Sequence, residues 1–242
     1  QTTNLKGKIM KKNKVIVIGD SISKGIIFED NKLSSTEPAI NIIGHTLDIE
    51  IENISSYGQT IKRVSQKGII DKIIKEKDKS KTNYAVLCIG GNDSDYDWKQ
   101  VDKTPQESHS PKTDLDEFEQ IYNQTVAKLK KNGFKVVVCS ICPIKAEWYF
   151  ENVISKIANP QNVLTFLHND LSNLTRHQEL FNNEIIKIAT KQNLPFLDIR
   201  KIFLQDNACF EYFCKDGCHL TKQGQNLVAN KVITKYYKDL KI

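Results

Sequence analysis

The sequence has no long apolar run and only one methionine, Met10, among its 242 residues. A membrane-spanning helix needs about 20 consecutive apolar residues, whereas the run at residues 15–18 ends at Gly19-Asp20. That run is also too short for the core of a signal peptide, so we expect a cytoplasmic protein without a membrane span. Because Met10 is the only methionine, we interpret residues 1–9 as a cloning scar or the end of a removed upstream segment.

A large excess of one charge is also lacking, since 35 Lys and Arg against 29 Asp and Glu leave a net charge of only +6. Lysines alternate with acidic residues in runs such as residues 75–79, which is typical of a solvated helix face, so no nucleic-acid partner is expected. Hydrophobic residues, at 39%, suffice for a sizeable core, and no repeat or flexible linker divides the chain. Residues 10–242 are therefore expected to form one domain, of unknown oligomeric state.

The six cysteines lack the spacing of a typical zinc site. Structural zinc usually takes two close cysteine pairs, but here Cys139-x-x-Cys142 closes an apolar run and the cluster Cys209, Cys214 and Cys218 is irregular. We interpret the cysteines as reduced, partly buried thiols, with zinc binding and disulfides as the alternatives.

Short β-rich runs alternate with longer helical segments, which is typical of an α/β domain with a parallel sheet. The strands are predicted at residues 14–19, 50–54, 84–89, 135–141 and 195–199. The helices are predicted at residues 39–47, 60–75, 114–131, 163–191 and 222–240. Thr113 and Thr221 are the expected N-caps of the third and fifth helices. Because several strands are continuously apolar, helices are expected on both faces of a five-stranded sheet.

Two polar segments, residues 93–112 and 143–161, follow the third and fourth strands. Ligands of open α/β sheets bind beyond the carboxyl ends of the strands, so both segments are candidates for substrate-facing loops, with plain surface loops as the alternative.

A serine follows the first predicted strand in Gly19-Asp20-Ser21. At a strand end such a hydroxyl is placed to act as a nucleophile, although a turn residue is the commoner role. Near the other end, Asp216 precedes His219 by three residues, so its carboxylate is able to hold imidazole Nδ1–H while Nε2 takes the serine proton. Gly58 and Asn92 follow the second and third strands and, with the Ser21 N–H, offer three donors to an oxyanion.

These four motifs, at four strand ends, resemble those of the SGNH (GDSL) hydrolase family from residue 14 to residue 240. Gly19-Asp20-Ser21-Ile22 matches its G-D-S-L/I block, Gly58 the glycine of its second block, Gly90-x-Asn92-Asp93 its G-x-N-D block, and Asp216-x-x-His219 its D-x-x-H block. Ser55 departs from the pattern, since many members carry glycine there.

The resemblance implies a flavodoxin-like three-layer α/β/α sandwich and a serine ester hydrolase without metal or organic cofactor. It also implies Ser21 as nucleophile, His219 as base, Asp216 as the group that orients the base, and Ser21, Gly58 and Asn92 as oxyanion donors. The expected substrate is a small-molecule or carbohydrate ester, with a preference for short acyl groups such as acetyl because no long apolar lid helix is predicted. Sugar O-acyl transfer, thioesterase and lysophospholipase activities remain open, while the intact motifs disfavour a non-catalytic binding module.

Several further residues are possible pocket residues, namely Asp20, Asp93, Tyr96, Trp98 and Trp148. Asp93, Asp95 and Asp97 have the spacing of a calcium loop, but Trp98 stands where that loop needs glycine, so no metal is expected there.

Overall fold

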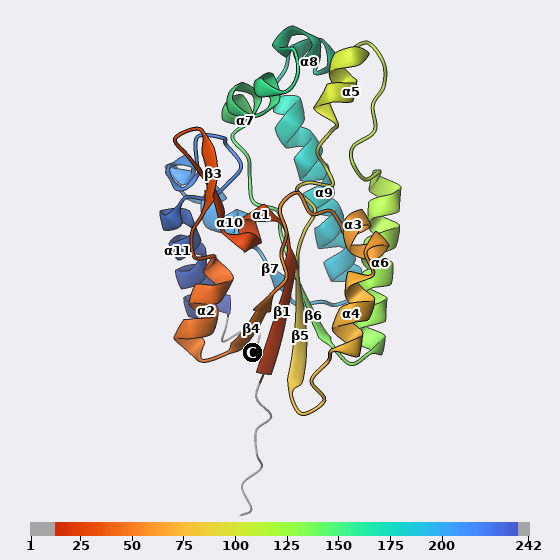
Figure 1. Ribbon diagram of the computed structural model, residues 1–242, viewed down its shortest axis with the longest axis vertical. Helices are drawn as coiled ribbons and strands as arrows, with labels where there is room; N and C mark the ends of the chain where they lie inside the picture. The colour runs from red at the N-terminus through yellow and green to blue at the C-terminus, as the bar shows by residue number, and fades with distance from the viewer. Residues whose placement is uncertain (1–12, 237–242) are drawn as a thin grey trace, which may run out of the picture.

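A five-stranded parallel sheet forms the centre of the computed structural model, which describes residues 13–236 (Figure 1). The strands are β1 (Asn13–Gly19), β4 (Glu50–Asn53), β5 (Thr82–Cys88), β6 (Lys135–Cys139) and β7 (Phe196–Leu197), in the order β4-β1-β5-β6-β7. Every pairing in this sheet is parallel; Val17, for example, lies between Asn53 and Val86. The predicted fold class is confirmed.

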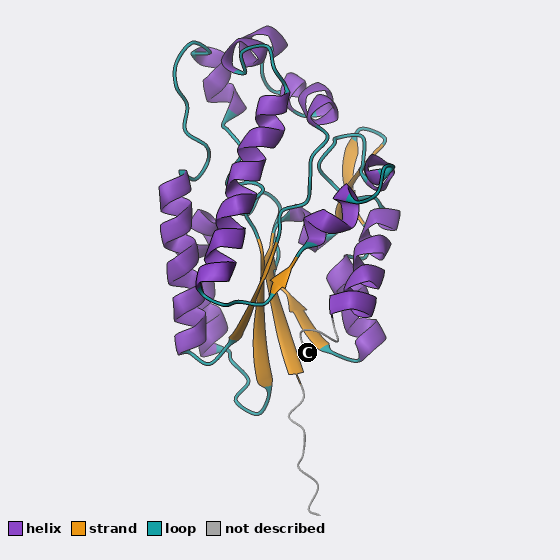
Figure 2. Cartoon of the chain, turned by 180° about the vertical axis from the view of Figure 1, so that it is seen from behind, coloured by secondary structure: helices purple, strands orange, loops and turns teal. Residues whose placement is uncertain are grey.

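Helices cover both faces of the sheet (Figures 1 and 2). One layer contains α3 (Ile61–Gln66), α4 (Ile69–Lys75), α6 (Leu115–Lys131) and α9 (Ser172–Lys191). The other contains α2 (Ala39–Leu47), α10 (Ile199–Leu204) and α11 (Lys222–Lys231), and α11 continues into the π-helical turn η3 (Val232–Tyr236). Over the described residues, no helix is both long and apolar enough to cross a bilayer. The predicted end of the last helix and the proposed domain start at residue 10 lie outside the described residues.

Two predicted helices are interrupted in the structure. The segment 60–75 divides into α3 and α4 because Gly68 adopts a φ of +61°. The segment 163–191 divides into α8 (Pro160–Phe166) and α9, with His168 and Asn169 at φ values of +53° and +58° between them. Left-handed backbone conformations end an α-helix. Because the apolar periodicity continues across both breaks, the sequence pattern did not reveal them.

One of the two predicted helix caps is wrong. Asp114 is the N-cap of α6, and the Thr113 hydroxyl donates instead to Asp93 at 2.7 Å. Thr221 caps α11 as predicted, since its hydroxyl accepts the Gly224 N–H at 3.1 Å. The Thr113 hydroxyl is therefore bonded to the buried Asp93 carboxylate and does not cap α6.

The segments 93–112 and 143–161 are more helical than the predicted loops. They contain α5 (Trp98–Lys103), α7 (Ala146–Asn152), η1 (Ile154–Lys156) and the start of α8. These four helices, which we call the cap, lie beyond the carboxyl end of the sheet (Figure 1). With the first turn of α9, they share a small apolar cluster formed by Trp98, Val101, Ala146, Ile154, Ala158, Val163, Leu167 and Leu174. The cap is thus a packed substructure.

Three short elements near the first strand were not predicted. They are α1 (Ser21–Lys24) and the antiparallel hairpin of β2 (Ile26–Glu29) and β3 (Lys32–Ser35). All residues of β3 are exposed. A further 3-10 turn, η2 (Cys209–Tyr212), precedes the segment that contains Asp216 and His219.

The two faces of the sheet carry different side chains. On the face covered by α6, Ile16, Ile18 and Leu87 pack against aromatic residues such as Phe118 and Phe181. On the face covered by α11, strand residues such as Val17, Tyr84 and Val86 pack against Phe203 and Phe213. We call these the α6 face and the α11 face.

Candidate active site

Ser21 is the first residue of α1, directly beyond the carboxyl end of β1. Asp20 is the N-cap of this short helix, and its carboxylate accepts the Ile22 N–H at 3.0 Å. The Gly25 backbone, at a φ of +81°, ends the helix after one turn. These contacts fix the backbone on both sides of Ser21, whose side chain borders a large cavity.

Gly19 serves close packing at the end of β1. A Cβ atom at this position would lie 2.6 Å from Ser23 Oγ and 2.9 Å from Ser55 Oγ. Its φ is not in the left-handed region, so space and not turn geometry requires glycine here.

His219 connects Ser21 with Asp216. Its Nε2 atom lies 2.9 Å from Ser21 Oγ, and its Nδ1 atom lies 2.5 Å from Asp216 Oδ2. The second oxygen of Asp216 accepts the backbone N–H groups of Cys218 and His219, both at 3.1 Å. The structure therefore brings a hydroxyl, an imidazole and a carboxylate into one hydrogen-bonded row across 198 residues of sequence. Such a row is able to activate a serine as a nucleophile.

At both carboxylates near Ser21, burial raises the pKa and hydrogen bonds lower it, but the balance between the two differs. Burial favours the neutral acid at Asp216, but the hydrogen bond and charge of His219, with the backbone donors, outweigh it and lower the pKa of Asp216. At Asp20 burial dominates and raises the pKa to about 6. Asp216 is therefore ionised at neutral pH, as a group that holds an imidazolium must be.

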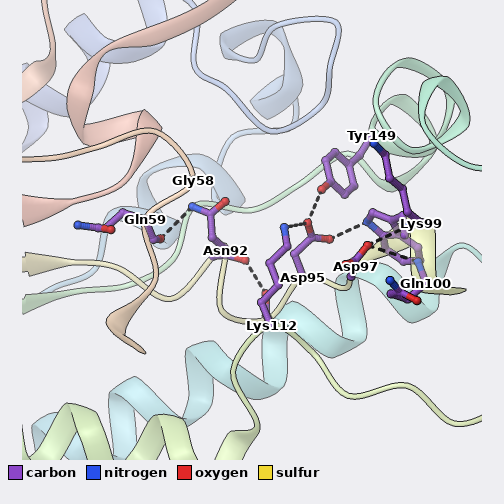
Figure 3. Close-up of polar contacts among 12 residues, drawn as sticks. Gly58, Gln59, Asn92, Asp95, Asp97, Lys99, Gln100, Lys112 and Tyr149 are labelled. Atoms are coloured by element: carbon purple, nitrogen blue, oxygen red, sulfur yellow. Dashed lines mark hydrogen bonds and ion pairs between the residues drawn. The ribbon is translucent and has the colours of Figure 1, made fainter. Parts of the chain in front are cut away.

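Asn92 and Gly58 come from the segments that follow β5 and β4 (Figure 3). Asn92 Nδ2 donates to the Gln59 carbonyl at 3.1 Å, which leaves the second hydrogen of the amide for a ligand. Gly58 has a φ of +62°, and Arg63 donates to its carbonyl at 2.8 Å. Both residues line the same cavity as Ser21.

Sequence reasoning missed two neighbours of His219. The exposed Tyr57 ring stacks on the imidazole, with 6.3 Å between ring centroids. Cys218 Sγ lies 3.6 Å from His219 Nδ1. The position of Tyr57 beside Gly58 was the available signal, because that glycine was already assigned to a strand end.

Two of the predicted pocket residues do not line the cavity. Asp93 is fully buried and accepts the Ile61 N–H at 3.0 Å as well as the Thr113 hydroxyl, so it anchors α3. Burial raises the pKa of Asp93 to about 7. Trp148 lies outside the lining, with Lys215 Nζ 4.7 Å from its ring centroid.

The other three predicted pocket residues, Asp20, Tyr96 and Trp98, do line the cavity. Trp98 nevertheless belongs mainly to the packed interior of the cap, since it is only 3% exposed.

Asp95 joins the parts of the cap, a role that the sequence did not indicate (Figure 3). It accepts hydrogen bonds from Trp98 Nε1 at 2.9 Å, Lys112 Nζ at 2.7 Å and the Tyr149 hydroxyl at 3.0 Å. Asp97 instead caps α5. Because Asp93, Asp95 and Asp97 each serve different donors, they do not form the calcium loop that their spacing suggests.

Cysteines lie close to this site and within the sheet. Cys88 Sγ and Cys139 Sγ are 2.9 Å apart, and Cys139 and Cys142 are buried in the cavity wall. Donor atoms of Asp216, Cys218 and His219 lie within 4.8 Å of one another, which is a possible metal-binding group. A metal on His219 Nδ1 would displace its hydrogen bond to Asp216, so these residues fit the hydrogen-bonded row better.

Comparison with known proteins identifies one matching family. The sequence model of the GDSL-like lipase/acylhydrolase family matches residues 15–232. No curated protein matches the sequence.

Similar solved structures cover almost the whole chain. A lipase/acylhydrolase from Enterococcus faecalis has a TM-score of 0.64 at 14% identity, covering 94% of this chain and 96% of its own. A catalytic mutant of an acetylxylan esterase from Geobacillus stearothermophilus has a TM-score of 0.64 at 18% identity, covering 94% and 95%. A psychrotrophic esterase from Pseudoalteromonas sp. has a TM-score of 0.61 at 14% identity, covering 96% and 100%. These likenesses concern the fold.

Proposed function

Because the chain belongs to the GDSL-like lipase/acylhydrolase family and is a carboxylic ester hydrolase, we propose that it cleaves its ester through a covalent acyl-enzyme on Ser21. The observation that carries this proposal is the 2.9 Å contact between Ser21 Oγ and His219 Nε2, continued by the contact from His219 to Asp216. A buried serine in this position has its base already within reach.

The reaction starts with attack of Ser21 Oγ on the ester carbonyl carbon while His219 Nε2 takes the hydroxyl proton. The resulting oxyanion accepts hydrogen bonds from the Ser21 and Gly58 N–H groups and from the Asn92 amide. The tetrahedral intermediate collapses, the bond to the alcohol oxygen breaks, and His219 gives its proton to the leaving alcohol. Water, deprotonated by His219, then releases the acid and restores Ser21.

Asp216 works through His219 in this scheme. Its ionised carboxylate holds the imidazole with Nδ1 protonated, so that Nε2 faces Ser21 as the proton acceptor. It also stabilises the imidazolium that forms during attack.

For the substrate we propose an ester of a small molecule or a carbohydrate. The acetylxylan esterase among the similar structures is named for such a carbohydrate ester, which supports this class. The preference for a short acyl group stays a prediction.

Replacing Ser21 by alanine tests the proposal. Hydrolysis of p-nitrophenyl acetate by Ser21→Ala should fall by about 10⁶ in kcat, since the nucleophile is gone. Ser23→Ala is the matched control, because Ser23 lies in the same short helix without contacting His219. Circular dichroism and the thermal midpoint should be unchanged in both variants.

Near-full activity of Ser21→Ala would contradict the proposal. Equal losses in Ser21→Ala and Ser23→Ala would show that the helix, and not the Ser21 hydroxyl, is what hydrolysis requires.

A further inference from the structure

Asp216, Cys218 and His219 form a group with metal-binding chemistry beside Ser21. Their donor atoms lie within 4.8 Å of one another, and all three residues line the cavity. No second group of three such side chains is found among residues 13–236. A thiolate, an imidazole and a carboxylate are the side-chain ligands that zinc takes in proteins. Ester hydrolysis uses only Asp216 and His219, so the Cys218 thiol is a third donor without a role in that reaction.

The distance between sulfur and nitrogen fits a single zinc ion. A Zn–S bond of about 2.3 Å and a Zn–N bond of about 2.0–2.1 Å, at a tetrahedral angle, place the two ligand atoms about 3.6 Å apart. Cys218 Sγ and His219 Nδ1 are 3.6 Å apart. Asp216 Oδ2 lies only 2.5 Å from Nδ1, whereas an oxygen and a nitrogen on one zinc are roughly 3.4 Å apart. The carboxylate therefore has to withdraw by roughly 1 Å, while the thiol and the imidazole are already suitably spaced.

Negative charge surrounds the Cys218 thiol. Burial, followed by the charges of Asp216, Asp95 and Asp20, raises the pKa of this thiol well above its ordinary value. Lys112 offsets one of these charges, since its Nζ lies 2.7 Å from Asp95. Carboxylates that disfavour a thiolate attract a divalent cation to the same place, and a bound cation deprotonates a coordinating thiol. The electrostatic field at this thiol therefore favours a metal ion.

We propose that Asp216, Cys218 and His219 bind a zinc ion that switches ester hydrolysis off. Zinc takes Cys218 Sγ, His219 Nδ1 and one oxygen of Asp216, and water is its fourth ligand. Cys218 gives its proton to solvent, and the imidazole keeps one proton, which moves from Nδ1 to Nε2. That the ion inhibits rests on the proposed function, whereas its binding rests on these three side chains alone.

Bound zinc and the hydrogen-bonded row exclude each other because they use the same atoms. In the row, His219 Nδ1–H donates to Asp216 and Nε2 accepts from Ser21. With zinc on Nδ1, Nε2 carries the remaining proton and is a donor, so it does not take the proton of Ser21. Inhibition should therefore be complete at saturating zinc, and removal of the ion should restore the row.

Zinc titration of the hydrolysis rate tests the proposal. The wild-type rate on p-nitrophenyl acetate should fall to background with zinc chloride and return with EDTA. In Cys218→Ala, the half-inhibitory zinc concentration should rise at least about tenfold, because even outer-shell partners of a metal ligand are worth about 10–100-fold in affinity. Each rate is normalised to the zinc-free rate of the same variant.

Cys142→Ala is the matched control for the loss of a thiol. Cys142 also lines the cavity but, among the described residues, belongs to no group of three potential ligands. Its half-inhibitory zinc concentration should stay within about twofold of wild type, since it is not a ligand of the proposed site.

Cobalt gives a reading that does not depend on hydrolysis. Co²⁺ binds the same nitrogen, oxygen and sulfur ligands as Zn²⁺, and a cobalt–thiolate bond adds a charge-transfer absorption. This absorption should appear in wild type and in Ser21→Ala, because Ser21 is not a ligand, and be absent from Cys218→Ala. Circular dichroism shows whether Cys218→Ala is folded, and Cys218→Ser, in which oxygen replaces the sulfur, gives the reading if it is not.

The outcomes separate this inference from the proposed function. Equal inhibition of wild type and folded Cys218→Ala at the same zinc concentrations, or a cobalt absorption that persists in Cys218→Ala, would overturn the zinc site and leave Ser21 chemistry intact. So would full wild-type hydrolysis in millimolar zinc. If the protein hydrolyses no ester but shows the absorption that depends on Cys218, metal binding stands and the proposed function fails.

Discussion

The two faces of the central sheet differ in how their side chains pack. On the α6 face, large side chains such as Phe118, Tyr122 and Phe181 are fully buried and fill the space between strands and helices. On the α11 face, Val15, Val17, Val86 and Cys139 line the cavity beside Ser21, although Phe203 on the same face is fully buried. Among the described residues of the α6-face cluster, only Ile89 and Ile141, at strand ends, reach that cavity.

This difference indicates that one face of the sheet serves mainly core packing and the other also lines the cavity. Alternate residues of β1 and β5 point to opposite faces, so one strand contributes both to a close-packed core and to a cavity wall. Stability should depend mainly on the α6 face, whereas the rate and the choice of substrate should depend on the α11 face and its carboxyl edge.

The largest expected effect is on the rate. Asp216→Asn should lower kcat for ester hydrolysis by up to about 10⁴, because an amide does not hold the required imidazole tautomer or its charge. The Asn oxygen still accepts the backbone N–H groups of Cys218 and His219, so the unfolding free energy should change little. Steady-state kinetics and urea titration measure the two quantities. A variant with wild-type kcat would contradict the role assigned to Asp216.

A pair of isoleucine truncations compares the two faces directly. Ile185 of α9 is fully buried on the α6 face and packs against Gly90, whereas Ile43 of α2 borders the cavity. Such truncations cost about 2–5 kcal/mol, and more where surrounding contacts are complete. Ile185→Ala should lie toward the upper end of that range and Ile43→Ala toward the lower end, as measured by urea titration. A larger cost for Ile43→Ala would remove the distinction between the faces.

A third expected effect concerns the pH dependence of stability. Because the pKa of Asp93 in the folded protein is raised to about 7, the unfolded chain releases this proton first as pH rises. The unfolding free energy should therefore fall between about pH 4 and pH 7, by at most about 1.4 kcal/mol per pH unit, and level off above that. Asp93→Asn should reduce this slope in urea titrations at several pH values, and Asp20, whose pKa burial raises to about 6, accounts for the slope that remains. An unchanged slope would show that another group causes it.

Ser21, Gly58 and Asn92 were selected from the sequence because each follows a predicted strand. The carboxyl ends of parallel strands meet at one edge, so strand prediction alone restricts where these residues lie. Asp216 and His219 were selected by their three-residue spacing, and the strand end that we also expected for them is wrong, since α10 and η2 separate them from β7. Local motifs also fix the backbone around them, as Asp20 and Thr221 do when they cap α1 and α11.

Other features depend on contacts between distant segments. Asp93 resembles a pocket residue in sequence, and only the positions of Ile61 and Thr113 reveal it as an anchor. The cap was predicted as loops because its helices are short and their apolar residues pack against one another across segments. The cavity was not predictable, since residues from many separate segments line it.

The most direct test of the central claim is covalent labelling with a fluorophosphonate, followed by mass spectrometry of the digested protein. The probe phosphonylates a serine, with loss of fluoride, only where a base takes the serine proton and donors stabilise the developing negative charge. The account predicts an adduct on the peptide that contains Ser21, with loss of ester hydrolysis in proportion to labelling. Adduct formation on another residue, or an unlabelled protein that still hydrolyses esters, would contradict it.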